Sequence, residues 1–150
     1  LPYSNVLFEL QLSGSQIVEV LEDAVGNYLD RGGSDGSHPY AAGLRWQLDL
    51  SQPRGRRFSA IEVQRKGSET WQAIDPHGSY TLVTSDYLAT GSDGYTTLGR
   101  IHQAGHSVNT YLNYTQTFVD YLLARGTVNR PAAADYSHQR VISRDGRVLP

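Results

Sequence analysis

The stretch from Tyr80 to Tyr95 reads YTLVTSDYLATGSDGY and contains two local patterns. Residues 80–83 alternate in aromatic, aliphatic and β-branched side chains of the kind typical of a half-buried strand. Residues 90–94 read Thr-Gly-Ser-Asp-Gly and predict a turn, because their two glycines can adopt positive φ. Strand and turn together deliver an aromatic ring, Tyr87, and a carboxylate, Asp93, to one loop. This combination is typical of a ligand-binding edge.

A second motif lies at the start of the sequence, where Leu1–Leu7 reads LPYSNVL and is followed by Leu12-Ser13-Gly14. The two motifs resemble signatures of the C-terminal domain of the 5′-nucleotidases, a family that includes bacterial UDP-sugar hydrolase and ecto-5′-nucleotidase. The family patterns are Pro-Phe-(Gly/Ser)-Asn-x-(Leu/Val) near the start and Asn-(Asp/Phe)-(Tyr/Phe)-Leu-Ala-x-Gly-Gly-Asp-Gly-(Tyr/Phe) later. Both motifs occur in the family's order, and with the region from Tyr28 to Trp46 between them the resemblance covers most of the chain.

The resemblance implies a nucleotide-binding role for five residues. At the matching positions, Tyr3 and Tyr87 would stack on the two faces of a nucleobase, an interaction worth about 1–3 kcal/mol per base and tolerant of base identity. Asp93 would accept hydrogen bonds from the ribose hydroxyls. Asn5 would hydrogen-bond a base nitrogen, and the backbone around Gly36 would close over the edge of the base. Both aromatic positions are tyrosine here, where phenylalanine is usual in the family.

Each of these residues also has an ordinary structural interpretation. Either tyrosine could pack in the core beside its strand, and Asp93 could belong to a simple Ser-Asp-Gly turn. Asn5 could hydrogen-bond local backbone at the entry to a strand. Gly36 lies in Arg31–Ser37, RGGSDGS, a glycine loop without a phosphate-binding motif, for which a mobile surface connection is the alternative. Ser92 stands where the family has glycine, which predicts a less permissive backbone.

The composition fits one domain, residues 1–150. A formal net charge of −2 with scattered Lys and Arg argues against nucleic-acid binding through bulk charge. The sequence has no cysteine, which removes disulfides, thiol catalysis and Cys-ligated zinc. No apolar run approaches the roughly 18 residues of a membrane span. Because methionine is absent, we expect the chain to be a fragment of a longer polypeptide.

Hydrophobic periodicity predicts an α+β fold with a mixed β-sheet flanked by helices. Residues 13–16, Ser-Gly-Ser-Gln, have the spacing of a capping box. A helix is therefore expected from there to about Asp30, with Glu22 and Asp23 facing solvent. A second helix is expected over residues 111–125, ended by the glycine that follows.

The strands are predicted from alternation and turn residues. Residues 44–50 and 58–64 are separated by a turn with proline and glycine, which predicts a hairpin. The stretch from Tyr95 to about Asn109 shows no clear period and is expected to be irregular. The other expected strands are Val6–Leu12, Trp71–Ile74 and Val141–Ile142, the last at a sheet edge.

The sequence contains no recognisable catalytic centre. His102 and His106 have the spacing of two metal ligands on a helix, but Gly105 lies between them and no His-Glu-x-x-His motif is present. Surface or capping roles are therefore the better interpretation for these histidines. No Gly-x-Ser-x-Gly elbow positions a nucleophile. We accordingly predict no catalytic and no metal-ligating residue in this chain.

The resemblance implies where the chemistry would take place. In the family, two divalent metal ions of zinc or manganese type activate water in a separate N-terminal domain. We therefore expect that catalytic domain and a nucleotide or nucleoside as partners, and a periplasmic or extracellular parent protein. The chain alone would hold no cofactor, bind nucleosides weakly and hydrolyse nothing, with no nucleic-acid partner and no membrane span. The alternative is a non-catalytic binding or interaction module that has kept only the fold.

Overall fold

The computed structural model describes residues 5–150, and this part of the chain contains seven strands and four α-helices. The strands are β1 (Val6–Ser13), β2 (Leu44–Asp49), β3 (Phe58–Val63), β4 (Gln72–Ala73), β5 (Ser79–Ser85), β6 (Ser107–Asn113) and β7 (His138–Ile142). The helices are α1 (Gly14–Leu29), α2 (Asp86–Ala89), α3 (Thr96–Gln103) and α4 (Tyr114–Arg125), with short 3₁₀ turns η1 (Asp35–Ser37), η2 (Ser92–Gly94) and η3 (Ala133–Asp135). None of the described helices is long and apolar enough to cross a lipid bilayer.

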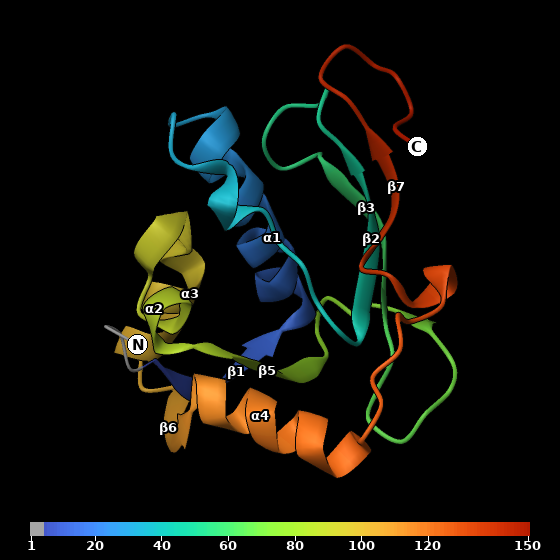
Figure 1. The fold of residues 1–150 in the computed structure, drawn as a ribbon. Coiled ribbons are helices and arrows are strands. Elements are labelled where there is room, and N and C mark those ends of the chain that lie inside the picture. The colour runs from blue at the N-terminus through green and yellow to red at the C-terminus, as the bar shows by residue number, and fades with distance from the viewer. Residues whose placement is uncertain (1–4) are drawn as a thin grey trace.

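The strands form two sheets, with helix α1 between them (Figure 1). A three-stranded antiparallel sheet has the order β5-β1-β6, and a four-stranded sheet has the order β4-β3-β2-β7. The second sheet is mixed, because β2 is antiparallel to β3 but parallel to β7. The predicted α+β class with flanking helices is confirmed, and the strands divide between two sheets.

Helix α1 fills the space between the sheets because its apolar residues recur at helical spacing. Trp46 on β2 is fully buried, and its ring meets Phe58 of β3 edge to face with centroids 5.9 Å apart. Burial of this apolar surface is the main favourable term in folding. The core includes Leu10 and Leu12 of β1, Ile17, Val20, Leu21, Ala24 and Val25 of α1, Leu48 of β2, Ile61 of β3, and Leu98 and Ile101 of α3.

Helix α1 begins with the predicted capping box. The Ser13 hydroxyl accepts from the Gln16 N–H at 3.1 Å, and the Gln16 side-chain oxygen accepts from the Ser13 N–H at 2.9 Å. The helix ends at Leu29 with Asp30 as its C-cap, as the pattern predicted. The β2–β3 hairpin, the short strand β4 and the edge strand β7 are confirmed as well.

Two regular elements, α3 and β6, lie in the stretch that was predicted to be irregular. The first turn of α3 is stabilised from another helix. The buried Asp23 carboxylate on α1 accepts from the Thr97 N–H at 2.9 Å and from the Thr96 hydroxyl at 3.3 Å. Strand β6 is formed by pairing with β1. Because both elements depend on distant partners, the local sequence carried little signal for them.

Two further predictions were wrong. The helix expected from Tyr111 begins at Tyr114, because the residues before it complete β6. Glu22 and Asp23 were expected to face solvent, but both are buried. The Glu22 carboxylate accepts the Arg57 N–H at 2.9 Å, next to the start of β3. These two carboxylates of α1 therefore accept hydrogen bonds from neighbouring elements rather than from water alone.

Arg57 is buried and links the β2–β3 hairpin to the end of α1. Its guanidinium donates two hydrogen bonds to the Asp30 carboxylate, at 2.9 and 2.7 Å, and its Nε donates to the Gln52 carbonyl at 3.0 Å. Such a bidentate pair is stronger and more directional than a single ionic contact. The hydrogen bonds from Arg57 hold the pKa of Asp30 below its ordinary value.

Replacing Arg57 by lysine keeps the charge but removes the planar fork, so we expect the free energy of unfolding to fall by about 1–3 kcal/mol. The Asp30 side chain is 35% exposed, so solvent screening favours the lower part of this range. Because the pKa of Asp30 is lowered in the fold, its contribution is present above the ordinary value of 3.8 and is lost as the pH falls below it.

Urea unfolding of wild type and Arg57→Lys at pH 7 and pH 3 measures this effect. The difference between the two proteins should be larger at pH 7. Arg56→Lys, at the exposed neighbouring position, is the control and should match wild type at both pH values. An Arg57→Lys difference that stays the same at both pH values would contradict the role of the ion pair.

Candidate functional site

Tyr87 and Asn5 lie at the same end of the three-stranded sheet. Leu7 of β1 pairs with Ser85 of β5, and Asn5 and Tyr87 each lie two residues beyond that pair. Tyr87 belongs to α2, whose first turn is capped by the Ser85 hydroxyl, which accepts from the Leu88 N–H at 3.4 Å. The Tyr87 side chain is 52% exposed, so its ring is not buried in the core and about half of its surface is open to solvent.

Asp93 lies in η2 with φ 58° and ψ 31°, in the left-handed region. Aspartate is among the few side chains that adopt this region readily. Gly91 and Gly94 also have positive φ, at 97° and 84°, whereas Ser92 does not. The serine that replaces a family glycine therefore stands at a position whose conformation does not require glycine. We refer to residues 91–94 as the Gly-Ser-Asp-Gly turn.

Asn27 of α1 joins this turn to the glycine loop that carries Gly36. A Cβ added to Gly94 would lie 2.6 Å from the Cβ of Asn27, and one added to Gly33 would lie 2.6 Å from its Nδ2. The same Nδ2 donates to the Ser37 hydroxyl at 3.2 Å. Because the Asn27 side chain occupies the space that side chains on these glycines would need, the turn and the loop meet over α1.

Tyr95 forms a second link between the same two segments. Its buried hydroxyl donates to the Ser37 carbonyl at 2.8 Å. Burial, together with the negative charge of Asp93, raises the pKa of Tyr95 to about 12, so the hydroxyl remains a donor at neutral pH. Gly36 is exposed, and its N–H is already hydrogen-bonded to the Ser34 hydroxyl at 3.0 Å. The structure thus places Gly36 and Asp93 on adjoining segments.

Four of the five predicted binding residues, Asn5, Gly36, Tyr87 and Asp93, lie in the described part of the chain. They form two pairs. Asn5 and Tyr87 share one end of a sheet, and Gly36 and Asp93 share a junction over α1. Tyr3 lies outside the described residues. The ligand contacts assigned to these residues remain predictions.

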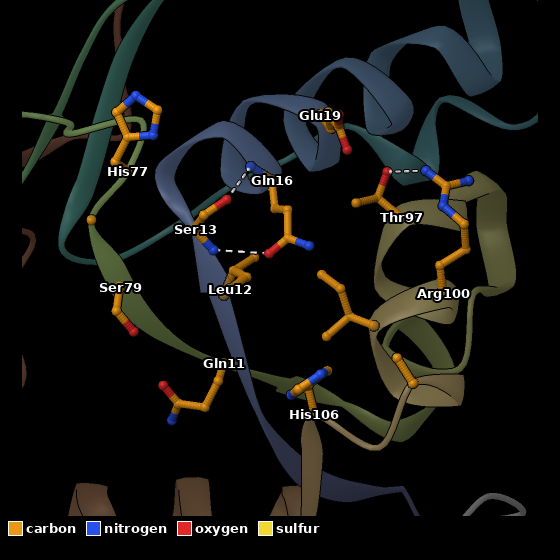
Figure 2. A pocket seen from close by; sticks show the side chains of 13 residues that line it. Gln11, Leu12, Ser13, Gln16, Glu19, His77, Ser79, Thr97, Arg100 and His106 are labelled. Carbon is orange, nitrogen blue, oxygen red and sulfur yellow. Dashed lines mark hydrogen bonds between the residues drawn. The ribbon is translucent and has the colours of Figure 1, made fainter.

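A cavity of about 580 Å³ opens between the start of α1 and α3 (Figure 2). Several of its polar side chains bond one another. Ser13 and Gln16 form the capping box, and Arg100 donates to the Thr97 hydroxyl at 3.1 Å. The Gly-Ser-Asp-Gly turn packs instead on Gly99, on another face of α3. Because none of the four described binding residues lines the cavity, we do not assign it to the nucleoside site.

A group of aromatic rings beside the glycine loop was missed by the sequence reasoning. Tyr28, His38, Tyr40 and His138 follow one another with ring centroids 5.3–6.0 Å apart and line a cavity of about 700 Å³. The Tyr28 hydroxyl lies 2.8 Å from His38 Nδ1. Burial, and secondarily the charge of His138, lowers the pKa of His38 and favours its neutral ring. These rings come from α1, the following loop and β7, so no local pattern indicates that they meet.

The family model described as 5′-nucleotidase, C-terminal domain, matches residues 1–100. The chain belongs to the 5′-nucleotidase family. It is 34% identical over 125 residues to the NAD 5′-nucleotidase of Haemophilus influenzae and 35% identical over 125 residues to a probable 5′-nucleotidase of Treponema pallidum.

These two matches cover 81% and 83% of the 5′-nucleotidase chain and 21% of each relative, so the chain spans about a fifth of their length. The solved structure of the Haemophilus influenzae NAD nucleotidase aligns with a TM-score of 0.76 at 34% identity. That alignment covers 83% of this chain and 22% of the solved one. The fold of this chain is therefore the fold of 5′-nucleotidase C-terminal domains.

The catalytic activity of 5′-nucleotidases depends on metal ions, and residues 5–150 contain no group of three His, Cys, Asp or Glu side chains that could hold one. His102 is one of the two histidines with helical metal-ligand spacing, and its ring contacts neighbouring side chains. Its ring meets Phe8 of β1 edge to face at 5.6 Å, and its Nδ1 lies 2.7 Å from the Ser107 hydroxyl. The described residues therefore do not fit a metal centre of this family.

Gly94 and Gly105 allow the junction at Asn27 to be tested, because they have nearly equal φ, 84° and 83°, and different surroundings. Alanine at either position introduces the strain of a left-handed L-residue, about 1–2 kcal/mol. Nothing lies within 4 Å of a Cβ at Gly105, whereas Gly94→Ala must push Asn27 aside. In urea unfolding at pH 7, Gly94→Ala should lose at least about 1 kcal/mol more than Gly105→Ala. Equal losses would show that the contact with Asn27 does not constrain the turn.

Proposed function

We propose that this chain is the nucleotide-binding, substrate-specificity domain of a 5′-nucleotidase family hydrolase that releases phosphate from nucleotides. The observation that carries the proposal is the half-exposed ring of Tyr87, which precedes Asp93 on a segment held against the glycine loop by Asn27. In this proposal the base stacks between Tyr3 and Tyr87, and Asp93 holds the ribose.

Stacking and carboxylate binding recognise different parts of a nucleoside. A tyrosine ring offers a flat apolar face to any base, which is worth about 1–3 kcal/mol. An ionised carboxylate offers only acceptors, which suits the two hydroxyls of a ribose. The side-chain amide of Asn5, at the same sheet end as Tyr87, would hydrogen-bond a base nitrogen. The backbone around Gly36, on the segment adjoining Asp93, would close over the edge of the base.

Phosphate release belongs, in this proposal, to an N-terminal catalytic domain of the parent protein. Two divalent ions of zinc or manganese type, bound there, would activate water for attack on the phosphate. The length of the relatives, about five times that of the matched region, leaves room for such a domain. The chain alone would bind nucleosides and hydrolyse nothing. The family resemblance also suggests export of the parent protein to the periplasm or the cell exterior.

A titration of the chain with adenosine, followed by NMR chemical shifts, tests the stacking role. Wild type should bind adenosine in the millimolar range, and Tyr87→Ala should weaken binding about tenfold, since one stacked face is worth about 1–3 kcal/mol. Tyr121→Ala removes a ring on α4 that is 49% exposed, outside the candidate binding residues and the aromatic group beside the glycine loop, and should leave adenosine binding unchanged. Ribose 5-phosphate, which lacks a base, should cause no comparable shifts. If wild type does not respond to adenosine, either the clamp needs the upstream domain to close or the chain has kept only the fold. The same titration of a protein that includes the upstream domain separates the two, and no response there would contradict the proposal.

The ribose contact is tested by Asp93→Asn with two ligands. Asparagine also adopts the left-handed region, so the turn should be preserved. Loss of the charged acceptor should weaken the binding of adenosine about tenfold or more, because hydrogen bonds to charged groups are worth about 1.5–3 kcal/mol. Binding of 2′,3′-dideoxyadenosine, which lacks both hydroxyls, should not change. If the variant weakens both ligands equally, Asp93 does not bind the ribose.

A further inference from the structure

Helix α4 has no buried residue, although its sequence is that of an amphipathic helix. Tyr114, Phe118 and Tyr121 follow one another at i, i+4 and i+7 and therefore share one face. Their side chains are 49–58% exposed. In water, most of the stability of a helix of this length comes from packing such a face against a partner. The exposed face of α4 indicates that a covering surface is required.

The exposed apolar surface continues on the three-stranded sheet. Val83 of β5, Glu9 of β1 and Val108 of β6 lie side by side across the three strands, and all three are exposed. Helix α4 lies on the opposite side of β1 and β5 from α1 (Figure 1). Leu112, on β6 just before α4, is exposed as well. We call this surface the apolar face; it comprises Val83, Val108, Leu112, Tyr114, Phe118 and Tyr121.

Strand β6 adds a second feature that needs a partner. Within residues 5–150 the sheet order is β5-β1-β6, so β6 presents an open edge beside the apolar face. Open edges expose unpaired N–H and C=O groups that readily pair with another segment, and proteins usually cover them. Large contiguous apolar patches on soluble proteins likewise mark interaction surfaces. Both features occur at the same place, so one docked segment could satisfy them together.

We propose that the apolar face is the docking surface for the polypeptide that precedes this chain in its parent protein. The position of Asn5 supports an occupant from the same polypeptide. The Asn5 carbonyl accepts the N–H of Tyr114, the first residue of α4, at 2.8 Å, so a segment that leads into Asn5 reaches the fold beside this face. Covalent connection gives such a segment a high effective concentration at the surface.

The relatives of this chain are long enough to contain such an occupant. The matching family model describes a C-terminal domain, so in a parent protein of this kind other polypeptide precedes it. About four fifths of each curated relative lies outside the match, since the match covers 21% of it. The proposal does not depend on nucleotide binding, because it concerns α4, β6 and the outer side of the sheet rather than the Gly-Ser-Asp-Gly turn.

Hydrogen–deuterium exchange of this 150-residue chain and of its full-length parent is the first test. In the isolated chain the amides of α4 should exchange rapidly, because the helix buries none of its residues and little packing resists its local opening. In the parent they should exchange at least about tenfold more slowly, and amides on the open edge of β6 should become protected as well. Unchanged exchange of α4 in the parent would overturn the proposal.

Thermal unfolding of two matched variants is the second test. Phe118→Gln should leave the Tm of the isolated chain nearly unchanged, because the ring is not buried there, and should lower the Tm of the parent by about 3–8 °C. Thr115→Gln changes an exposed polar residue of the same helix and should shift neither Tm. Equal effects of Phe118→Gln on the chain and the parent would contradict docking within one polypeptide.

Sedimentation and vesicle flotation distinguish the other occupants. The parent should remain monomeric and stay off lipid vesicles, with or without Phe118→Gln. A parent dimer that Phe118→Gln abolishes would mean that a second copy covers the apolar face. Vesicle binding that the same variant abolishes would mean that lipid covers it. Either result would overturn the proposal.

Discussion

The buried carboxylate of Asp23 fixes the relative positions of three parts of the molecule. One oxygen accepts the Thr97 N–H and the Thr96 hydroxyl at the start of α3, and the other forms an ion pair with Arg54 in the β2–β3 turn. A buried carboxylate is stable only while its donors stay in place, so α3 and the hairpin are held to α1 by one group. The Gly-Ser-Asp-Gly turn packs on Gly99 of α3. The position of Asp93, the proposed ribose-binding carboxylate, therefore also depends on Asp23 holding α3 in place.

Helix α1 organises the fold with its polar residues as well as its apolar ones. Its apolar side chains fill the space between the sheets. Its polar side chains contact neighbouring elements: Glu22 accepts the Arg57 N–H beside β3, and Asn27 meets the two glycine-containing segments. At its C-cap, Asp30 binds the Arg57 guanidinium. Carboxylates such as Glu22 and Asp23 therefore lie on the buried side of the helix, and exposed polar residues such as Glu19 face solvent. The framework and the candidate site therefore share one support.

The distance between interacting residues along the chain explains which parts of the fold could be predicted from the sequence. The capping box of α1, the β2–β3 hairpin and strand β5 were predictable because each is encoded by residues close together in the chain. Helix α3 and strand β6 were not, since the donors that satisfy Asp23 and the pairing with β1 come from far away. Burial of Glu22 could not be predicted for the same reason. From sequence alone a helix carboxylate is expected to face solvent. Glu22 is buried because it accepts the N–H of Arg57, which lies 35 residues further along the chain.

The same distinction between local and long-range signals applies to the candidate site. The motifs identified Tyr87 and Asp93, because both lie in one short stretch. The junction at Asn27 and the hydrogen bond from Tyr95 to Ser37 depend on α1 and two loops meeting, which no single stretch encodes. The aromatic rings that begin with Tyr28 were missed for that reason too.

The parallel pairing of β7 with β2 has a consequence for synthesis of the chain. Trp46 pairs with His138, and its backbone N–H donates to the Ser137 carbonyl at 2.8 Å, so the second sheet is completed only after β7, about 90 residues beyond β2, has been synthesised. The three-stranded sheet needs nothing beyond Asn113. Pairings between residues so distant in sequence form slowly. A nascent chain released before residue 138 would carry the elements of the candidate site, yet it would expose the edge of β2 to neighbouring chains.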